Sequence, residues 1–97
     1  MADELDVVVT LRVHAGKEGE AETLLREMEA STLANDEGCL RYEWYRAQTP
    51  QTFILLERWT SNAAVQAHLK APHMAAIFQK IGPLLPEPFT ALPLTKL

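Results

Sequence analysis

The chain has 97 residues, of which 47% are hydrophobic and 23% charged, with a formal net charge of -4. This length predicts a single domain over residues 1–97 with a modest core, and the composition is that of a folded rather than a disordered protein. The acidic balance argues against a nucleic-acid or anionic-membrane surface. A lone cysteine, no long apolar run and an acidic N-terminus together predict a cytoplasmic protein that has no membrane span.

A strand and a helix are the first predicted elements. Residues 5–15 are rich in β-branched side chains and place aliphatic residues on one face at a period of two: Val7, Val9, Leu11 and Val13. Residues 17–35 change to a helical period, with the stripe Ala21, Leu24, Leu25, Met28 and Thr32. The five glutamates of this helix lie mostly outside the stripe, and we interpret them as a solvated face.

Two further strands form a predicted antiparallel hairpin around a polar turn at 48–51. The strand at 39–47 has one face made of Leu40, Tyr42 and Trp44. The strand at 52–60 has one face made of Phe53, Leu55, Glu57 and Trp59. Both faces of the second strand are mainly apolar, which predicts a central strand that is covered on both sides.

The C-terminal third predicts two short helices and a strand. Thr60 or Ser61 caps a helix over 62–70, and Pro72 ends it and opens another that runs to about residue 81. The segment 89–94 alternates but contains Pro93, so it belongs at a sheet edge or a subunit boundary.

The predicted order β-α-β-β-α(α)-β is that of an α+β fold, the ferredoxin-like split βαβ plan with an antiparallel sheet. Two helical segments cover only one face of such a sheet, although both faces are hydrophobic. We therefore expect a homodimer in which a second copy covers the other face.

Two histidines, His68 and His73, flank Pro72 in the stretch QAHLKAPHM. In a continuous helix five residues turn the chain by about 500°, so the rings would point apart, whereas a break at Pro72 lets them reach one cavity. His68 shares the apolar face of its helix, either as a core histidine bonded to a backbone carbonyl or as a site residue. His73 is either partly exposed at a helix N-terminus or part of the same site. Zinc needs three or four ligands, and since His14 is distant and Cys39 is the only cysteine, we expect no metal.

Glu57 lies on an apolar strand face, where a carboxylate must be paired, hydrogen-bonded or raised in pKa. It is either a structural salt-bridge partner of Arg41, Arg46 or Arg58 or a general base. The aromatic residues gather in the hairpin and form either core or the wall of a pocket. Cys39 is interpreted as a buried bystander rather than a nucleophile. The sequence contains no nucleotide or flavin motif.

The segments EGCLRYEWYR (37–46) and FILLERWTSNAAVQAHLKAPHM (53–74) resemble the antibiotic biosynthesis monooxygenase (ABM) family, in particular its small bacterial quinol monooxygenase-like members. The likeness covers nearly the whole chain. It implies a dimeric α+β barrel and a pocket between sheet and helices in each subunit. It also implies oxidation of a small quinol or phenolic aromatic substrate by O₂ without a cofactor.

The resemblance implies roles for particular residues. His68, His73 and Glu57 would be the catalytic residues, with the histidines binding or deprotonating substrate and Glu57 orienting a partner. The substrate pocket would be lined by aromatic side chains: Trp59, Tyr42, Trp44 and Phe78.

Three alternatives remain open at this point. The first is an isomerase acting on a phosphorylated signalling metabolite, although the sequence has no phosphate-cradling glycine loop. The second is a non-catalytic dimeric module that binds a small ligand. The third is a haem-degrading enzyme, which is not expected. Haem-degrading relatives carry an Asn in the first strand, a Trp in the second helix and a haem-ligating His further along the chain. At the corresponding positions this chain has Val8 or Thr10, His68 and Phe78.

Overall fold

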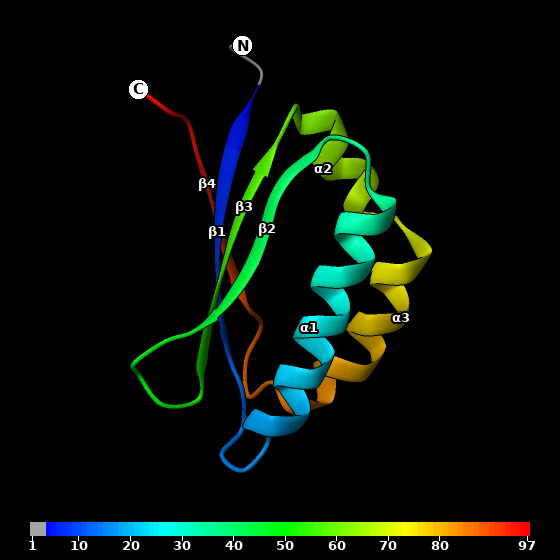
Figure 1. Cartoon of the computed structure of the whole chain (residues 1–97). Coiled ribbons are helices and arrows are strands. Elements are labelled where there is room, and N and C mark those ends of the chain that lie inside the picture. The colour runs from blue at the N-terminus through cyan, green and yellow to red at the C-terminus, as the bar shows by residue number, and fades with distance from the viewer. Residues whose placement is uncertain (1–3) are drawn as a thin grey trace.

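The computed structural model describes residues 4–97, which form one four-stranded sheet with the helices on one side of it (Figure 1). The spatial strand order is β2-β3-β1-β4, and every neighbouring pair is antiparallel. The α+β, ferredoxin-like prediction is confirmed. The elements in chain order are β1 (Leu5–Arg12), α1 (Glu18–Asn35), β2 (Cys39–Arg46), β3 (Thr52–Trp59), α2 (Asn62–Leu69), α3 (Pro72–Ile81), the short 3₁₀ helix η1 (Gly82–Leu84) and β4 (Thr90–Leu94).

The core lies between the helices and the facing side of the two central strands. On β1 the predicted alternation is confirmed, since Val7, Val9 and Leu11 are all buried, and they pair with Glu57, Leu55 and Phe53 of β3. Helix α1 contributes its predicted stripe to the core, and α3 contributes three further side chains, Met74, Ile77 and Ile81. Each large aliphatic side chain removed from water here contributes roughly 1.5–3 kcal/mol before entropy is subtracted.

The start of β2 differs from the predicted alternation. A bulge between Cys39 and Arg41 shifts the register against β3, and Leu40 is half-exposed instead of sharing the buried face of Tyr42. Such a bulge adds one residue to a strand and redirects its side chain. Just before it, Gly38 has φ +85°, and a Cβ there would lie 2.7 Å from the Thr60 hydroxyl oxygen. The chain therefore turns tightly into β2 at a position that only glycine fits.

The break between α2 and α3 follows the predicted signals. Ser61 caps α2, because its hydroxyl accepts a hydrogen bond from the backbone N–H of Ala64. Ala71 is extended, and Pro72 opens α3 at a position where its missing N–H costs nothing. The two helices consequently meet at an angle beside the C-terminal end of α1 (Figure 1).

The other face of the sheet is not covered by any element of residues 4–97 (Figure 1). On that face Val8 of β1 pairs with Leu56 of β3 and with Leu92 of β4. The three side chains form an apolar row, in which Leu92 is 61% exposed. β4 is an edge strand that contains Pro93, as predicted. The row gives the predicted homodimer a surface to bury, and dimerisation stays a prediction. Among the described residues, no helix is both long and apolar enough to cross a membrane.

Candidate active site

A small apolar pocket lies between the helix-facing side of the sheet and helices α2 and α3. Its volume is about 100 Å³, below the roughly 150 Å³ of a protein cavity that takes up benzene. The half-exposed side chains of Leu69 and Phe89 belong to its wall and mark its open side. Most of the lining is aliphatic or aromatic, and the residues that bring a polar group are Tyr42, Trp44, Glu57 and His68. The pocket therefore has room for no more than about one ring.

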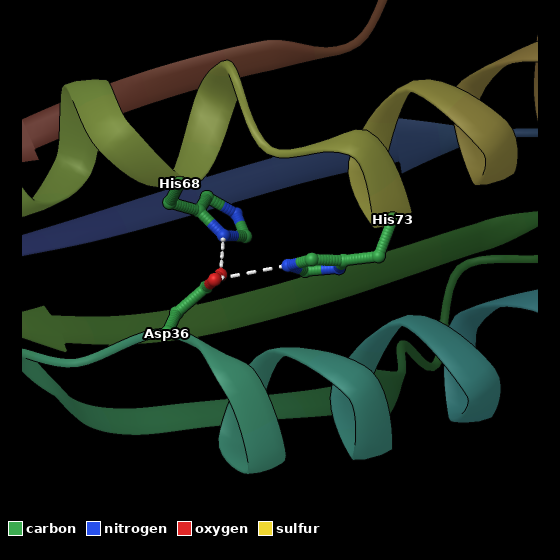
Figure 2. A group of neighbouring side chains, drawn as sticks. All are labelled: Asp36, His68 and His73. Atoms are coloured by element: carbon green, nitrogen blue, oxygen red, sulfur yellow. Dashed lines mark hydrogen bonds and ion pairs between the residues drawn. The ribbon is translucent and has the colours of Figure 1, made fainter.

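His68 enters this pocket from α2 and is 3% exposed. Its ring packs against Trp59 and Tyr42, with centroid distances of 4.8 and 5.3 Å. Its Nδ1 forms a short hydrogen bond with a carboxylate oxygen of Asp36 (Figure 2). Burial lowers the pKa of His68 below its ordinary value, and the Asp36 hydrogen bond opposes this only in part. The partner is thus a carboxylate and not the backbone carbonyl that was one of the sequence-based options.

His73 reaches the same carboxylate from the first turn of α3. Its Nε2 lies 2.9 Å from Asp36 Oδ1, and its Nδ1 lies 3.1 Å from the Ser31 hydroxyl oxygen. The centroids of the two imidazole rings are 6.1 Å apart, so the break at Pro72 does bring them together as predicted (Figure 2). The side chain of His73 does not line the pocket, however.

Asp36 is the residue that sequence reasoning missed. It is the C-cap of α1, where its backbone N–H bonds to the carbonyl of Thr32 and its extended backbone turns the side chain toward α2 and α3. Its position just after a predicted helix is typical of a solvated loop acid. No local pattern in the sequence indicates that two histidines more than thirty residues away lie against it.

Glu57 is buried in the pocket wall, and the predicted salt bridge is wrong. The arginines that could have paired with it form other ion pairs, Arg41 with Glu43, Arg46 with Glu22 and Arg58 with Asp6. Its Oε1 instead accepts a 2.7 Å hydrogen bond from Trp59 Nε1. Burial raises the pKa of Glu57, and the Trp59 hydrogen bond only partly offsets this. The period of two along β3, which puts both side chains on one face, was the signal for this pair.

Three of the four predicted aromatic residues line the pocket: Tyr42, Trp44 and Phe78. Trp59 does not, because it is fully buried behind the lining, edge-to-face with Tyr42 at 6.4 Å. Phe89 was missed, and it stacks on Phe78 at 6.0 Å. Within residues 4–97, the indole Nε1 of Trp44 is the one buried side-chain nitrogen or oxygen without a hydrogen-bond partner. A buried donor without a partner costs free energy, and none of the described residues supplies that partner.

Cys39 takes no part in this arrangement. Its thiol is only partly buried, and it donates a weak hydrogen bond to the backbone carbonyl of Arg41. Burial raises its pKa to about 11, and the Glu57 and Asp36 carboxylates add to the shift. At neutral pH the group is therefore a thiol rather than the thiolate that a nucleophile requires.

A family model places the chain among known proteins. The model of the antibiotic biosynthesis monooxygenase family matches residues 5–80, which include β1, α1, the hairpin, α2 and α3 up to its last residue but one. The chain belongs to the antibiotic biosynthesis monooxygenase family. This match confirms the resemblance to the ABM family that the two sequence segments indicated.

The probable quinol monooxygenase YgiN of Escherichia coli strain K12 is 29% identical to this ABM chain over 59 residues. The match covers 52% of the chain and 57% of that relative, so it spans little more than half the length of each. The likeness agrees with membership of the ABM family.

Solved structures of other proteins share the fold of this chain over almost its full length. A candidate antibiotic biosynthesis monooxygenase from Caulobacter crescentus CB15 is 27% identical with a TM-score of 0.92, covering 99% of this chain and 92% of that one. Rv0793 from Mycobacterium tuberculosis is 24% identical with a TM-score of 0.88, and the match covers 97% of this chain and 95% of Rv0793. At that lower identity the second likeness shows the fold alone. The fold of the ABM family is therefore present here from β1 to β4.

Proposed function

We propose that this ABM chain is a cofactor-independent monooxygenase that oxidises a small quinol or phenol with O₂. The observation that carries the proposal is the placement of His68, whose ring lies in an apolar pocket while its Nδ1 is held from behind by a buried carboxylate. Such an arrangement fixes the tautomer with the proton on Nδ1 and leaves Nε2 as an acceptor. No hydrogen bond to that Nε2 is present within residues 4–97. The histidine is thus set up to accept a proton from a ligand.

The proposed reaction needs no electron carrier, because the substrate supplies all four electrons that O₂ consumes. His68 removes a phenolic proton, and the electron-rich anion reacts with O₂. One oxygen atom enters the ring, the other leaves as water, and a hydroquinone becomes a hydroxylated quinone. The contribution of the protein is positioning and a dry cavity in which this anion forms.

The other polar groups of the pocket have supporting roles in this proposal. Glu57, from the sheet side, holds or donates a proton, and Trp44 Nε1 donates a hydrogen bond to a substrate oxygen. Tyr42 and Phe78 contact the ring, while Trp59 and His73 act by holding Glu57 and Asp36 in place. The volume of about 100 Å³ favours a single-ring substrate.

The isomerase alternative lacks support in the pocket. A phosphorylated metabolite needs cationic side chains or a glycine-rich cradle, and no Lys or Arg occurs among the described pocket-lining residues. The binding-module alternative makes a different experimental prediction, since such a protein binds a ring compound and leaves it unchanged.

Oxygen uptake with a panel of single-ring hydroquinones and phenols tests the proposal. We expect uptake with at least one of them that falls by roughly 10²- to 10⁴-fold in His68→Gln, because a general base contributes about that much. His14→Gln, a change of an exposed histidine outside the pocket, is the matched control and should keep the full rate. Binding without oxygen uptake, or full activity in His68→Gln, would refute the oxygenase proposal.

A further inference from the structure

Three side chains of the metal-ligating kind converge behind the pocket wall. Asp36, His68 and His73 come from the end of α1, from α2 and from α3, and their ligand atoms all lie within 4.8 Å of one another (Figure 2). Histidine and cysteine alone are too few in this chain for a metal site, but the Asp36 carboxylate completes a set of three. We propose that these residues form a binding site for a divalent transition-metal ion, Zn²⁺ in particular.

The geometry is close to what such an ion requires. Zinc bonds of about 2.0–2.2 Å in a tetrahedron place neighbouring ligand atoms roughly 3.3–3.6 Å apart. Here Asp36 Oδ1 lies 2.9 Å from His73 Nε2, while the other carboxylate oxygen meets His68 Nδ1. Small rotations of the three side chains therefore open the space for one ion. Because each side chain starts on a different element of a packed core, the set is held together before any metal arrives.

The chemistry of the ligands selects the ion. Two imidazoles and one carboxylate suit zinc and its transition-metal neighbours, whereas Mg²⁺ and Ca²⁺ prefer sites made of oxygen alone. Three protein ligands leave a fourth position for water. The His73 side chain is 20% exposed and that of Asp36 10% exposed, so the site is open to solvent on the His73 side.

Ser31 provides the outer support that metal-bound histidines usually have. Its hydroxyl oxygen lies 3.1 Å from His73 Nδ1 and 3.2 Å from the carbonyl oxygen of Met28. In the metal-free protein His73 Nε2–H donates to Asp36, and the Ser31 hydroxyl donates to Nδ1. When an ion takes Nε2, the ring proton moves to Nδ1, where Nδ1–H donates to Ser31 while Ser31 donates to Met28.

Metal binding would also switch off the proposed base. An ion on His68 Nδ1 forces the remaining ring proton onto Nε2, and that nitrogen then has no lone pair to accept a proton. Zinc should thus inhibit oxygen uptake, a consequence that rests on the proposed function. The binding itself does not depend on it.

Titration of the metal-free protein with Zn²⁺ by calorimetry, and with Co²⁺ by visible absorption, tests the site. We expect one ion per chain in the wild type and in the control His14→Gln, and at least about tenfold weaker binding in His73→Gln and in Ser31→Ala, which keeps all three ligands. Circular dichroism of each variant verifies folding. Absence of binding to the wild type, or equal affinity in His73→Gln and the wild type, would overturn the site. Zinc binding by a protein that consumes no oxygen with any quinol would support the metal site and refute only the oxygenase.

Discussion

Replacement of Asp36 by Asn tests the core of the site, because it removes the charge and keeps the shape. The carboxylate accepts from His68 Nδ1 and from His73 Nε2. Asparagine offers one acceptor oxygen and turns an NH₂ group toward the other ring. The nitrogen that meets the NH₂ group must then accept, so the proton of that ring moves to its other nitrogen.

The expected loss of stability follows from burial. The Asp36 side chain is 10% exposed and that of His68 3%, so solvent screens this interaction little. A hydrogen bond to a charged group contributes about 1.5–3 kcal/mol, and Asp36→Asn replaces one such bond and weakens another. We expect a loss of about 2 kcal/mol in the free energy of unfolding, which for a domain of this size lowers Tm by roughly 8–16 °C.

Urea unfolding measures that loss, and Glu37→Gln is its control. Glu37 is the next residue along the chain and is exposed, so the same change of charge there should alter stability by less than about 0.5 kcal/mol. NMR of the imidazole nitrogens then identifies the tautomers. In the wild type, His68 should carry its proton on Nδ1. A wild-type His68 protonated on Nε2 alone, or equal stability of the two variants, would show that Asp36 does not hold the histidines.

Three further predictions concern single residues. Trp44→Phe keeps the ring but removes the unpaired Nε1 donor, so fluorescence titration should show about 3- to 10-fold weaker binding of a hydroquinone, and equal affinity would contradict the proposed contact. Burial raises the pKa of Glu57, so above pH 4.5 the unfolded chain loses a proton that the folded protein keeps. The stability of the wild type relative to Glu57→Gln should therefore fall as pH rises through the folded-state pKa, and a pH-independent difference would be inconsistent with this. Gly38→Ala should cost more than about 2 kcal/mol in thermal unfolding because of the positive φ and the contact with Thr60, whereas Gly19→Ala, which meets no atom within 4 Å, should change stability by less than about 1 kcal/mol.

The fold was predictable because its information is local. Period-two and helical spacing identified the buried faces of β1, β3 and α1, and those faces alone determine which side of the sheet the helices cover. The bulge at Leu40 was not predictable in this way, since it depends on how Gly38 packs against Thr60 and α2.

The site was predictable only where neighbouring residues carry it. The break at Pro72 indicated that His68 and His73 converge, and the period of β3 contained the Glu57–Trp59 pair. The contact of Asp36 with the histidines could not be predicted from the sequence, because it arises from the packing of α1 against α3. No short-range pattern encodes that packing. The same holds for the pocket lining, where Trp59 falls behind the wall although it shares a strand face with Glu57.

Burial shifts the pKa values of the acid and the base in the apolar pocket in opposite directions. Taking a group out of water disfavours its charged state, so the pKa of Glu57 rises while that of His68 falls. Both shifts favour the uncharged form of the group, and an uncharged wall admits a neutral phenol at little desolvation cost. In the proposed reaction, however, His68 takes the phenolic proton, so a cation forms in a nearly dry site and must be compensated. The Asp36 carboxylate on the far side of the ring supplies that compensation, beyond its part in fixing the tautomer. The substrate anion is then left on the pocket side, where O₂ would meet it.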